Sequence, residues 1–392
     1  MIRSFVLLMG FAGVVGAQDL FRTDPPSLGG VVFPVFHATA AYGDSTRDPA
    51  DLTAHGHDPN DQFTLQGIDL GFSLQAGEHV SGFVNHRFFL DDEDDWDGEW
   101  EEAFLKLVGL PGDLELRGGR MLNRVGRQNS VHLHGWNFVD ANLMTSRMLG
   151  EEGLLTNSVE VAWNVPTPFD SVVSVAFGEA VPHDEHDHGH EEEHEGEEDE
   201  DDHEEELEGE EGLFDRDILS VRYDARWNYN DFHQYRFGVN GVVGDNSFGR
   251  TTTAFGADVE YAWLENGLEG GGRSLRWRTE VMQREIEYQH EDGDGRGDVT
   301  ELALSTMLLF GFAEDWEAGL RYGWVEGVSE NHLHELPERY RLSAAVTRRL
   351  TFSDSTSGYA RLQVNHEDHE EFGDETSVWL QFGFDFGAPE VR

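Results

Sequence analysis

A two-residue repeat of apolar and polar side chains runs through almost the whole chain beyond Val31. Around Leu219, for example, Val221 and Tyr223 continue one apolar face, and polar residues stand between them. Successive side chains of a β-strand point to opposite faces, so this pattern predicts strands with one apolar and one polar side. No strong helical stripe interrupts it. The pattern recurs in about sixteen segments, near residues 31–42, 62–74, 79–90, 99–109, 113–122, 156–165, 170–179, 215–228, 232–243, 249–263, 273–289, 298–312, 316–325, 338–351, 356–365 and 375–386.

The distribution of arginine and aromatic residues favours a membrane barrel over a soluble sandwich, which would also alternate. Arginines occupy the polar face in the middle of strands, and aromatic residues such as Trp227 and Trp324 lie near segment ends on the apolar face. A wet lumen and interfacial aromatic girdles account for both features. We therefore predict an all-β fold, an antiparallel transmembrane β-barrel of about sixteen strands, spanning residues 31–386 as a single domain.

The connections between the predicted strands nearly alternate between long and short, as in outer-membrane barrels with long external loops and short periplasmic turns. A Gly-rich stretch at 264–272 is the exception on the short side. The pattern predicts the outer membrane of a Gram-negative bacterium, with outer-membrane lipid around the barrel. The long connections are 43–61, 91–98, 123–155, 180–214, 244–248, 290–297, 326–337 and 366–374.

The N-terminus and the composition narrow the location and the partners. Residues 1–17 combine one arginine, a short apolar run and small terminal residues, so we predict a secretory signal peptide followed by a short N-terminal segment at 18–30. The chain has no cysteine, and its formal net charge is −51. That charge repels phosphate, so nucleic acid is not an expected partner. We find no sequence motif of an enzyme and predict none.

The most unusual segment is the acidic tract at 183–211, inside the loop predicted at 180–214. Its side chains cannot build a core, so we predict a disordered loop rich in histidine and acid. Imidazole and carboxylate together suit zinc and similar divalent cations, although a solubilising charged loop is the alternative. The six histidines are His183, His186, His188, His190, His194 and His203.

Further histidines fall in the predicted external connections, several of them with His-x-His spacing. In extended backbone both rings of such a pair face the same way, so a pair can contribute to one cation site. Each pair is incomplete as a site, so we expect zinc to bind weakly and transiently, without an organic cofactor. The candidate ligands are His55, His57, Asp58, His132, His134, His332, His334, His366 and His369.

The predicted loop at 123–155 differs from the acidic tract because it is long and rich in apolar and aromatic residues. Such a loop packs against a surface, and in a wide barrel that surface is the lumen wall. We predict that His132 and His134 lie near a constriction and that Trp136 and Phe138 anchor the loop. A lid folded over the outer rim is the alternative.

Eight arginines on polar strand faces are candidate pore-lining residues. They could form a charge ring that sets ion preference, or they could neutralise neighbours and fill the lumen. They are Arg222, Arg226, Arg236, Arg276, Arg278, Arg321, Arg341 and Arg361.

Several short motifs resemble a family of porin-like outer-membrane barrels that are often labelled zinc-regulated TonB-dependent outer-membrane receptors. The similarity covers roughly residues 50 to 170 and is most specific at His132-x-His134-x-Trp136. It also includes the segment from His55 to Asn60, Leu110-Pro111-Gly112, and Gly119-Arg120-Met121-Leu122 before Gly126-Arg127. The resemblance implies a Gram-negative outer membrane and a connection with zinc supply.

The sequence thus predicts a porin-like channel for small hydrophilic solutes, with external loops that capture zinc or a similar divalent cation. By analogy with porins, the expected assembly is a homotrimer. Two alternatives remain: a non-conducting barrel that binds metal at the surface, and a structural barrel whose acidic loops bind the outer lipid layer through divalent ions.

Overall fold

A computed structural model describes most of the barrel and several of its loops. The described residues are 22–23, 30–49, 53–54, 56–90, 96–150, 153–181, 213–269, 271–289, 296–330, 333–370 and 373–387. The predicted signal peptide, most of the predicted N-terminal segment and nearly all of the acidic tract's loop lie outside them.

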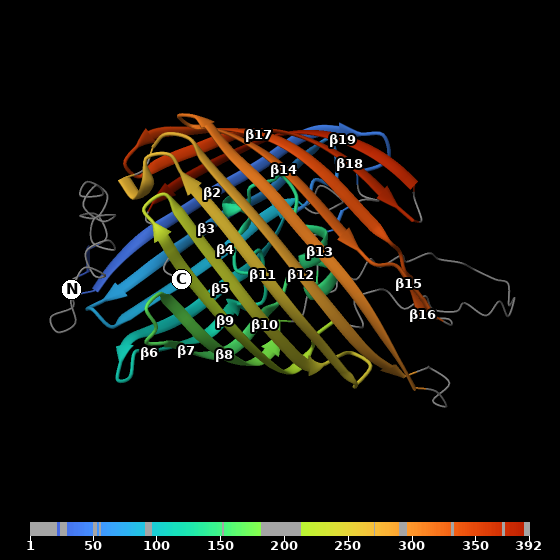
Figure 1. Ribbon diagram of the computed structural model, residues 1–392, viewed down its shortest axis with the longest axis horizontal. Coiled ribbons are helices and arrows are strands. Elements are labelled where there is room, and N and C mark those ends of the chain that lie inside the picture. Colours follow the sequence, from blue (N-terminus) through green and yellow to red (C-terminus); the bar gives the residue numbers. More distant parts are fainter. Residues whose placement is uncertain are drawn as a thin grey trace, which may run out of the picture.

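Sixteen antiparallel strands form a closed barrel, which confirms the predicted fold class (Figure 1). The last strand pairs with the first long one and so closes the sheet, and each of the sixteen predicted segments corresponds to one strand. The strands are β2 (Gly30–Ser45), β3 (Phe63–Ala76), β4 (Val80–Leu90), β5 (Trp96–Leu110), β6 (Leu114–Leu122), β7 (Leu155–Asn164), β8 (Asp170–Ala180), β9 (Arg216–Asn230), β10 (His233–Asp245), β11 (Thr251–Leu264), β12 (Ser274–Gln289), β13 (Arg296–Ala313), β14 (Trp316–Val325), β17 (Arg339–Ser353), β18 (Thr356–His369) and β19 (Gly373–Gly387).

Among the described residues, three further short strands lie outside this closed ring. Strand β1 (Arg22–Thr23) pairs with the start of β2. Strands β15 (Val328–Glu330) and β16 (Leu333–Leu336) form a separate hairpin within the connection from β14 to β17. The alternation in the sequence did not predict this hairpin, because its strands are too short to show a period.

Burial follows the period-two pattern along the strands. On β9, Val221 is 43% exposed on the outside, whereas its neighbour Arg222 is only 6% exposed on the inside. The outer surface carries apolar side chains along every long strand, and rings such as Trp227 and Tyr235 pack together near strand ends. An apolar belt with terminal aromatic residues is the surface that a bilayer requires.

Short turns join the strands at one end of the barrel, and the longer connections gather at the other (Figure 1). Two of the short turns contain aspartates with left-handed backbone, Asp113 with φ 58° and Asp315 with φ 62°. Aspartate tolerates this conformation better than most residues do, which explains its position in tight turns. Among the described residues, no helix has both the length and the apolar composition that a membrane-spanning helix needs.

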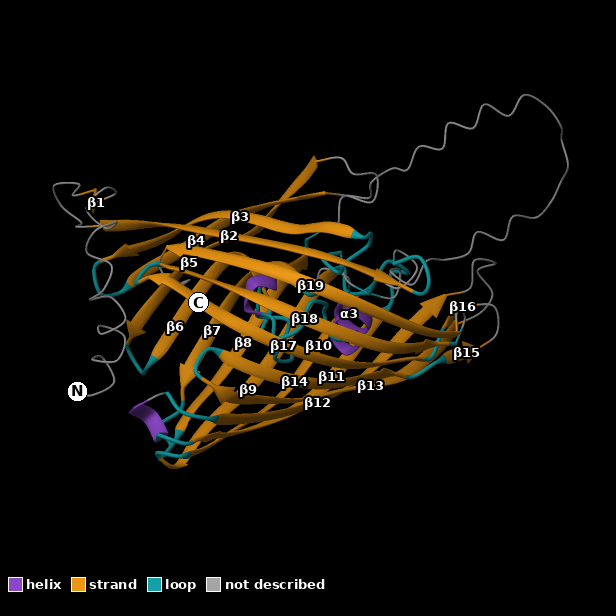
Figure 2. Ribbon diagram, turned by 90° about the horizontal axis from the view of Figure 1, so that it is seen from above, coloured by secondary structure: helices purple, strands orange, loops and turns teal. Residues whose placement is uncertain are grey.

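The connection between β6 and β7, residues 123–154, enters the barrel and is called the lumenal loop below (Figure 2). It contains the 3-10 turn η2 (Leu133–Gly135) and the helix α3 (Leu143–Leu149), whose N-cap Asn142 accepts a hydrogen bond from the Thr145 amide at 2.8 Å. Met144 and Met148 of α3 are buried in an apolar cluster with strand residues such as Ile218 and Met282. The loop therefore packs against the lumen wall, as its composition predicted, and is not a lid over the rim.

Candidate functional site

The lumenal loop is fastened to the strands β13, β14, β17 and β18 by apolar and cationic contacts. The Phe138 ring is buried with Met307 and Leu309. Arg361 donates from Nη1 to the Phe138 carbonyl at 2.8 Å and from Nη2 to the Trp136 carbonyl at 2.7 Å.

Trp136 itself packs within the loop, against Leu133, and donates from Nε1 to the Val131 carbonyl at 2.9 Å. Of the two predicted anchors, Phe138 thus contacts the wall directly, and Trp136 does so through its backbone.

Asp140 is the ionic centre of this attachment. Its carboxylate accepts hydrogen bonds from Arg321, from Gln363 Nε2 at 2.9 Å and from Asn365 Nδ2 at 2.8 Å, and it lies 3.1 Å from Arg341 Nη1. Burial by itself would raise the pKa of Asp140, but Arg321 and Arg341 outweigh burial and lower the pKa to about 2. At neutral pH the loop therefore carries a negative charge that holds two buried wall arginines.

A second loop, residues 46–62 between β2 and β3, is tied to the lumenal loop through Asp58. The Asp58 carboxylate accepts from the amides of Ala141 at 2.7 Å and Ala54 at 3.1 Å. Burial raises the pKa of Asp58 to about 6, although Arg341 at 3.8 Å opposes that rise. Two external connections that are far apart in the sequence therefore form one unit inside the barrel mouth.

Histidines and carboxylates from the opposite wall hold the other side of the lumenal loop. His132 is fully buried, with Nε2 3.0 Å from Glu102 Oε2 and Nδ1 3.3 Å from Glu101 Oε2. The His134 ring stacks on the His37 ring with centroids 3.6 Å apart and planes 6° apart. His37 Nδ1 in turn lies 2.7 Å from Asp385 Oδ1. Because carboxylates already surround His132, the structure places it in the loop attachment and not on an open surface.

Arg87 on β4 completes this wall, with Nε 2.7 Å from Asp69 and Nη2 2.7 Å from Glu101. Nothing in the sequence alone singles out His37, Asp69, Arg87 or Glu101. All of them stand at polar, inward positions of their strands, which was the available signal. Strand alternation identifies an inward residue, but only the path of the lumenal loop shows which inward residues it contacts.

The remaining predicted metal ligands are dispersed. His57 is buried in the 46–62 loop, 3.8 Å from Glu99, and His366 lies half-exposed on β18, 3.9 Å from Asp374. His369 is buried near the end of β18, and His334 belongs to β16. Outside the described residues lie His55, His332 and the six histidines of the acidic tract.

Within the described ranges, no group of three or more histidines and carboxylates has the arrangement of a metal site. The rings of His132 and His134 are 5.8 Å apart and nearly perpendicular, so this His-x-His pair does not present two nitrogens to one point. The 3-10 turn explains the difference, because only extended backbone directs residues i and i+2 the same way. Zinc binding by the external histidines stays a prediction.

The eight candidate pore arginines divide into two groups. Arg321, Arg341 and Arg361 are buried and bind the lumenal loop, so they fill the barrel on that side. The other five line cavities or pair with carboxylates beside them: Arg222, Arg226, Arg236, Arg276 and Arg278.

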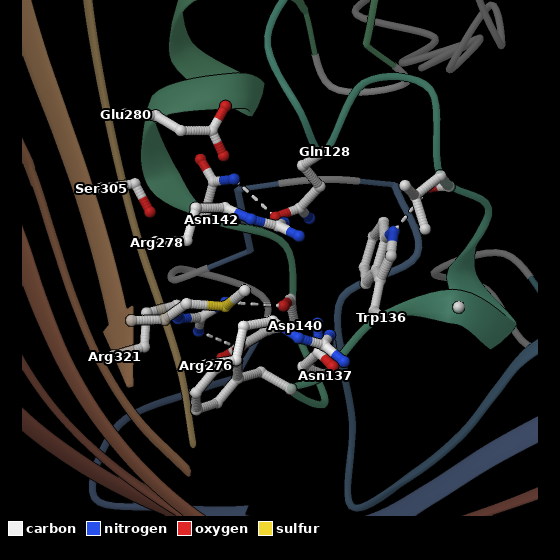
Figure 3. Close-up of a pocket in the computed structure, with 14 residues that line it drawn as sticks. Gln128, Trp136, Asn137, Asp140, Asn142, Arg276, Arg278, Glu280, Ser305 and Arg321 are labelled. Carbon is white, nitrogen blue, oxygen red and sulfur yellow. Dashed lines mark hydrogen bonds and ion pairs between the residues drawn. The ribbon is translucent and has the colours of Figure 1, made fainter. Parts of the chain in front are cut away.

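Three cavities lie along the lumen wall, and residues of the lumenal loop line the first two of them but not the third. One of about 140 Å³ is lined by Asp140, Arg278 and Arg321 (Figure 3). A second of about 330 Å³ is lined by Arg124 and Arg278, and a third of about 310 Å³ by Arg226. The first and third share Arg276, the first and second share Arg278, and the second and third share Arg236. Arginine therefore dominates the polar space that the loop leaves open.

No family model matches the chain. An uncharacterized protein of Aquifex aeolicus (strain VF5) is 39% identical over 69 residues, which is 18% of this chain and 14% of that protein. The chain thus matches only a small part of that relative's length.

Solved outer-membrane channels share the fold. The channel DcaP of Acinetobacter baumannii superimposes with a TM-score of 0.56 at 10% identity, over 93% of this chain and 99% of DcaP. The anion-selective porin of Comamonas acidovorans gives 0.51 at 11% identity, over 92% and 100%. OmpT of Vibrio cholerae in a trimer form gives 0.50 at 10% identity, over 91% and 99%.

These neighbours confirm the porin-like barrel fold that the sequence predicted, and the predicted Gram-negative outer-membrane location agrees with that fold. They do not support the label of a TonB-dependent receptor that the family resemblance carried. The short motifs behind that resemblance lie largely in the 46–62 loop and the lumenal loop, and such segments do not determine how transport is energised.

Proposed function

We propose that the protein is a passive channel for small hydrophilic solutes, whose cross-section is set by the lumenal loop. The observation that carries this proposal is the attachment of the loop to both walls, through Asp140 on one side and His132 on the other. A loop held in this way narrows a sixteen-strand barrel, which is otherwise wide enough for an aqueous channel. The polar cavities beside it support passage of hydrated solutes.

Reconstitution into planar bilayers tests the channel directly. We expect stepwise conductance in KCl, and liposome swelling that is fast for small sugars and amino acids and negligible for oligosaccharides. Empty-detergent reconstitution is the control. A barrel that inserts, as shown by its resistance to unfolding in SDS without heating, but gives no conductance would favour a binding or structural barrel.

The acidic tract supports a second proposal, that the external surface captures zinc or a similar divalent cation. Its support is compositional: six histidines among nineteen carboxylates within residues 183–211. Such ligands bind zinc weakly and exchange it quickly, so the metal would be cargo and not a resident cofactor. Two alternative functions would not need a conducting lumen. One is a barrel that binds metal at its surface, and the other is a structural barrel whose acidic loops bind the outer lipid layer through divalent ions.

A homotrimer is the assembly that we propose. The support is the fold alone, because one solved structure of OmpT of Vibrio cholerae, which has a similar fold, is of a trimer form. Light scattering of the detergent-solubilised protein, with the detergent mass subtracted, measures the number of chains. A monomeric mass that persists in outer-membrane extracts made with mild detergent would refute the trimer.

A further inference from the structure

The cavity of about 310 Å³ at the short-turn end of the lumen has an unusual charge arrangement. Arg226 on β9 and Arg236 on β10 are directly opposed cross-strand partners, and both line this cavity together with Arg276 of β12. Like charges placed directly opposite each other on a sheet destabilise it. An anion between them would remove that repulsion.

The carboxylates beside Arg236 are shared among several arginines. Asp224 is shared by Arg236 at 2.8 Å, Arg127 at 2.7 Å and Arg222 at 3.1 Å. Asp258 is shared by Arg127 at 2.5 Å and Arg222 at 2.7 Å. Three arginines therefore share these two carboxylates.

The two acids that line the cavity are themselves paired with other arginines. Glu260 pairs with Arg278 at 2.7 Å, and Glu317 pairs with Arg349 at 3.4 Å. Within the described chain, Arg226 and Arg276 form no ion pair. Their guanidinium groups are available to a solute that enters the cavity.

We propose that Arg226, Arg236 and Arg276 form a binding site for small organic anions that carry carboxylate groups, and that this site gives the channel a preference for anions. The proposal rests on the channel function argued above. Guanidinium groups match the planar carboxylate with two parallel hydrogen bonds, which a chloride ion cannot use. Leu309, whose side chain faces inward beside Arg276, also lines the cavity and gives a short carbon chain an apolar contact.

The size of the cavity agrees with a small ligand, because about 310 Å³ corresponds to roughly ten water molecules. The net charge of −51 does not oppose the proposal. Charges beyond a Debye length, about 8 Å at physiological ionic strength, are largely screened, so the groups that line the lumen decide its selectivity.

The test compares the wild type with the double variant Arg226→Gln/Arg276→Gln in two measurements. Reversal potentials in a KCl gradient give the chloride-to-potassium permeability ratio. Calorimetry in detergent with succinate, and separately with inorganic phosphate, gives binding. The matched control is Arg273→Gln, since Arg273 lies in the exposed turn between β11 and β12 and pairs with Glu265 at 2.7 Å.

For the wild type we expect chloride preference and succinate binding. In the double variant we expect the chloride preference to disappear and succinate affinity to fall by about tenfold or more, as for the loss of charged hydrogen bonds. Arg273→Gln should change neither. The variant Arg226→Lys/Arg276→Lys keeps the charge, so it should retain chloride preference but bind succinate more weakly than the wild type. If the glutamine variant does not fold, this lysine variant tests the site in its place.

Several results would overturn the proposal. Potassium preference in the wild type would exclude an anion channel while leaving the channel function intact. Equal succinate binding by the wild type and the glutamine or lysine variant would exclude the site. Phosphate binding in place of succinate would exclude the carboxylate class. An absence of conductance in every salt would refute the channel function and anion selectivity together, and calorimetry would then decide the binding site alone.

Discussion

The guanidinium carbon of Arg321 lies 4.5 Å from the centroid of the Phe138 ring. The same arginine donates to the carboxylate of Asp140, two residues further along the loop. The ring also approaches Gly319, where an added Cβ would come within 3.2 Å of Phe138 Cζ. The wall is therefore shaped for this ring, and one arginine fixes both the apolar and the ionic anchor of the lumenal loop.

Replacing Phe138 with alanine should loosen the lumenal loop and enlarge the channel. The substitution removes a buried ring and its cation–π contact, at a cost of about 3–5 kcal/mol to the loop attachment. We expect larger and noisier single-channel conductance, measured in planar bilayers. Phe382→Ala is the matched control, because Phe382 faces outward and is exposed. Unchanged conductance in both variants would show that Phe138 does not hold the constriction.

The variant Asp140→Asn should release the loop at neutral pH. Asparagine keeps a hydrogen-bonding group but leaves Arg321 and Arg341 without the charge they hold, and such a buried break costs about 3–5 kcal/mol. Limited proteolysis within residues 123–154 should become faster in the variant than in the wild type. Asp170→Asn, on the exposed start of β8, is the control. Equal cleavage rates would contradict the role of Asp140.

Acid should have the same effect on the wild type. The pKa of Asp140 is lowered to about 2 from its ordinary value of 3.8, so the charged form contributes stability above pH 3.8. That contribution is lost as the pH falls through about 2. The single-channel conductance should therefore stay constant between pH 8 and pH 4, where the loop is attached. It should rise below pH 3, where the loop is released. Loop release already near pH 5 would argue against Asp140 as the determining group.

The pKa of Asp58 should be shifted upward, in the opposite direction from the pKa of Asp140. Burial raises its pKa from 3.8 to about 6, so the folded protein takes up this proton before the unfolded chain does. Its charge destabilises the fold above pH 6, and the penalty disappears as the pH falls from about 6 to 3.8. Infrared titration should show a protonated-carboxyl band with a midpoint near pH 6 that is missing in Asp58→Asn. A midpoint near 4 for that band would contradict this environment.

Deleting residues 184–210 should leave the barrel folded and remove most of the low-affinity zinc binding. Strands β8 and β9 flank the deletion and pair directly with each other, so the barrel keeps this pairing without the segment. Equilibrium dialysis measures the zinc stoichiometry, and the shift on heating in SDS gels measures folding. His132→Ala/His134→Ala is the comparison, since these histidines already contact carboxylates and should contribute little zinc binding. Unchanged stoichiometry after the deletion would refute metal capture by the tract.

The barrel could be read from the sequence because strand alternation is a local property. Each side chain of a membrane-spanning strand faces either lipid or the lumen. The apolar Val221 and the charged Arg222 therefore indicate by their residue type which side each one faces. The same reasoning placed Arg226, Arg236 and Arg276 inside. The apolar content of residues 131–139 was likewise a local sign that the loop must be covered.

Only the tertiary structure decided which inward residues act together. The sequence gives Arg226 and Arg361 the same inward orientation, yet Arg361 binds the lumenal loop and Arg226 faces a cavity. His37 and His134 stack although 97 positions separate them in the numbering. Strand register and the path of one loop through the lumen set these contacts, and both depend on packing between segments distant in sequence, which no local pattern records.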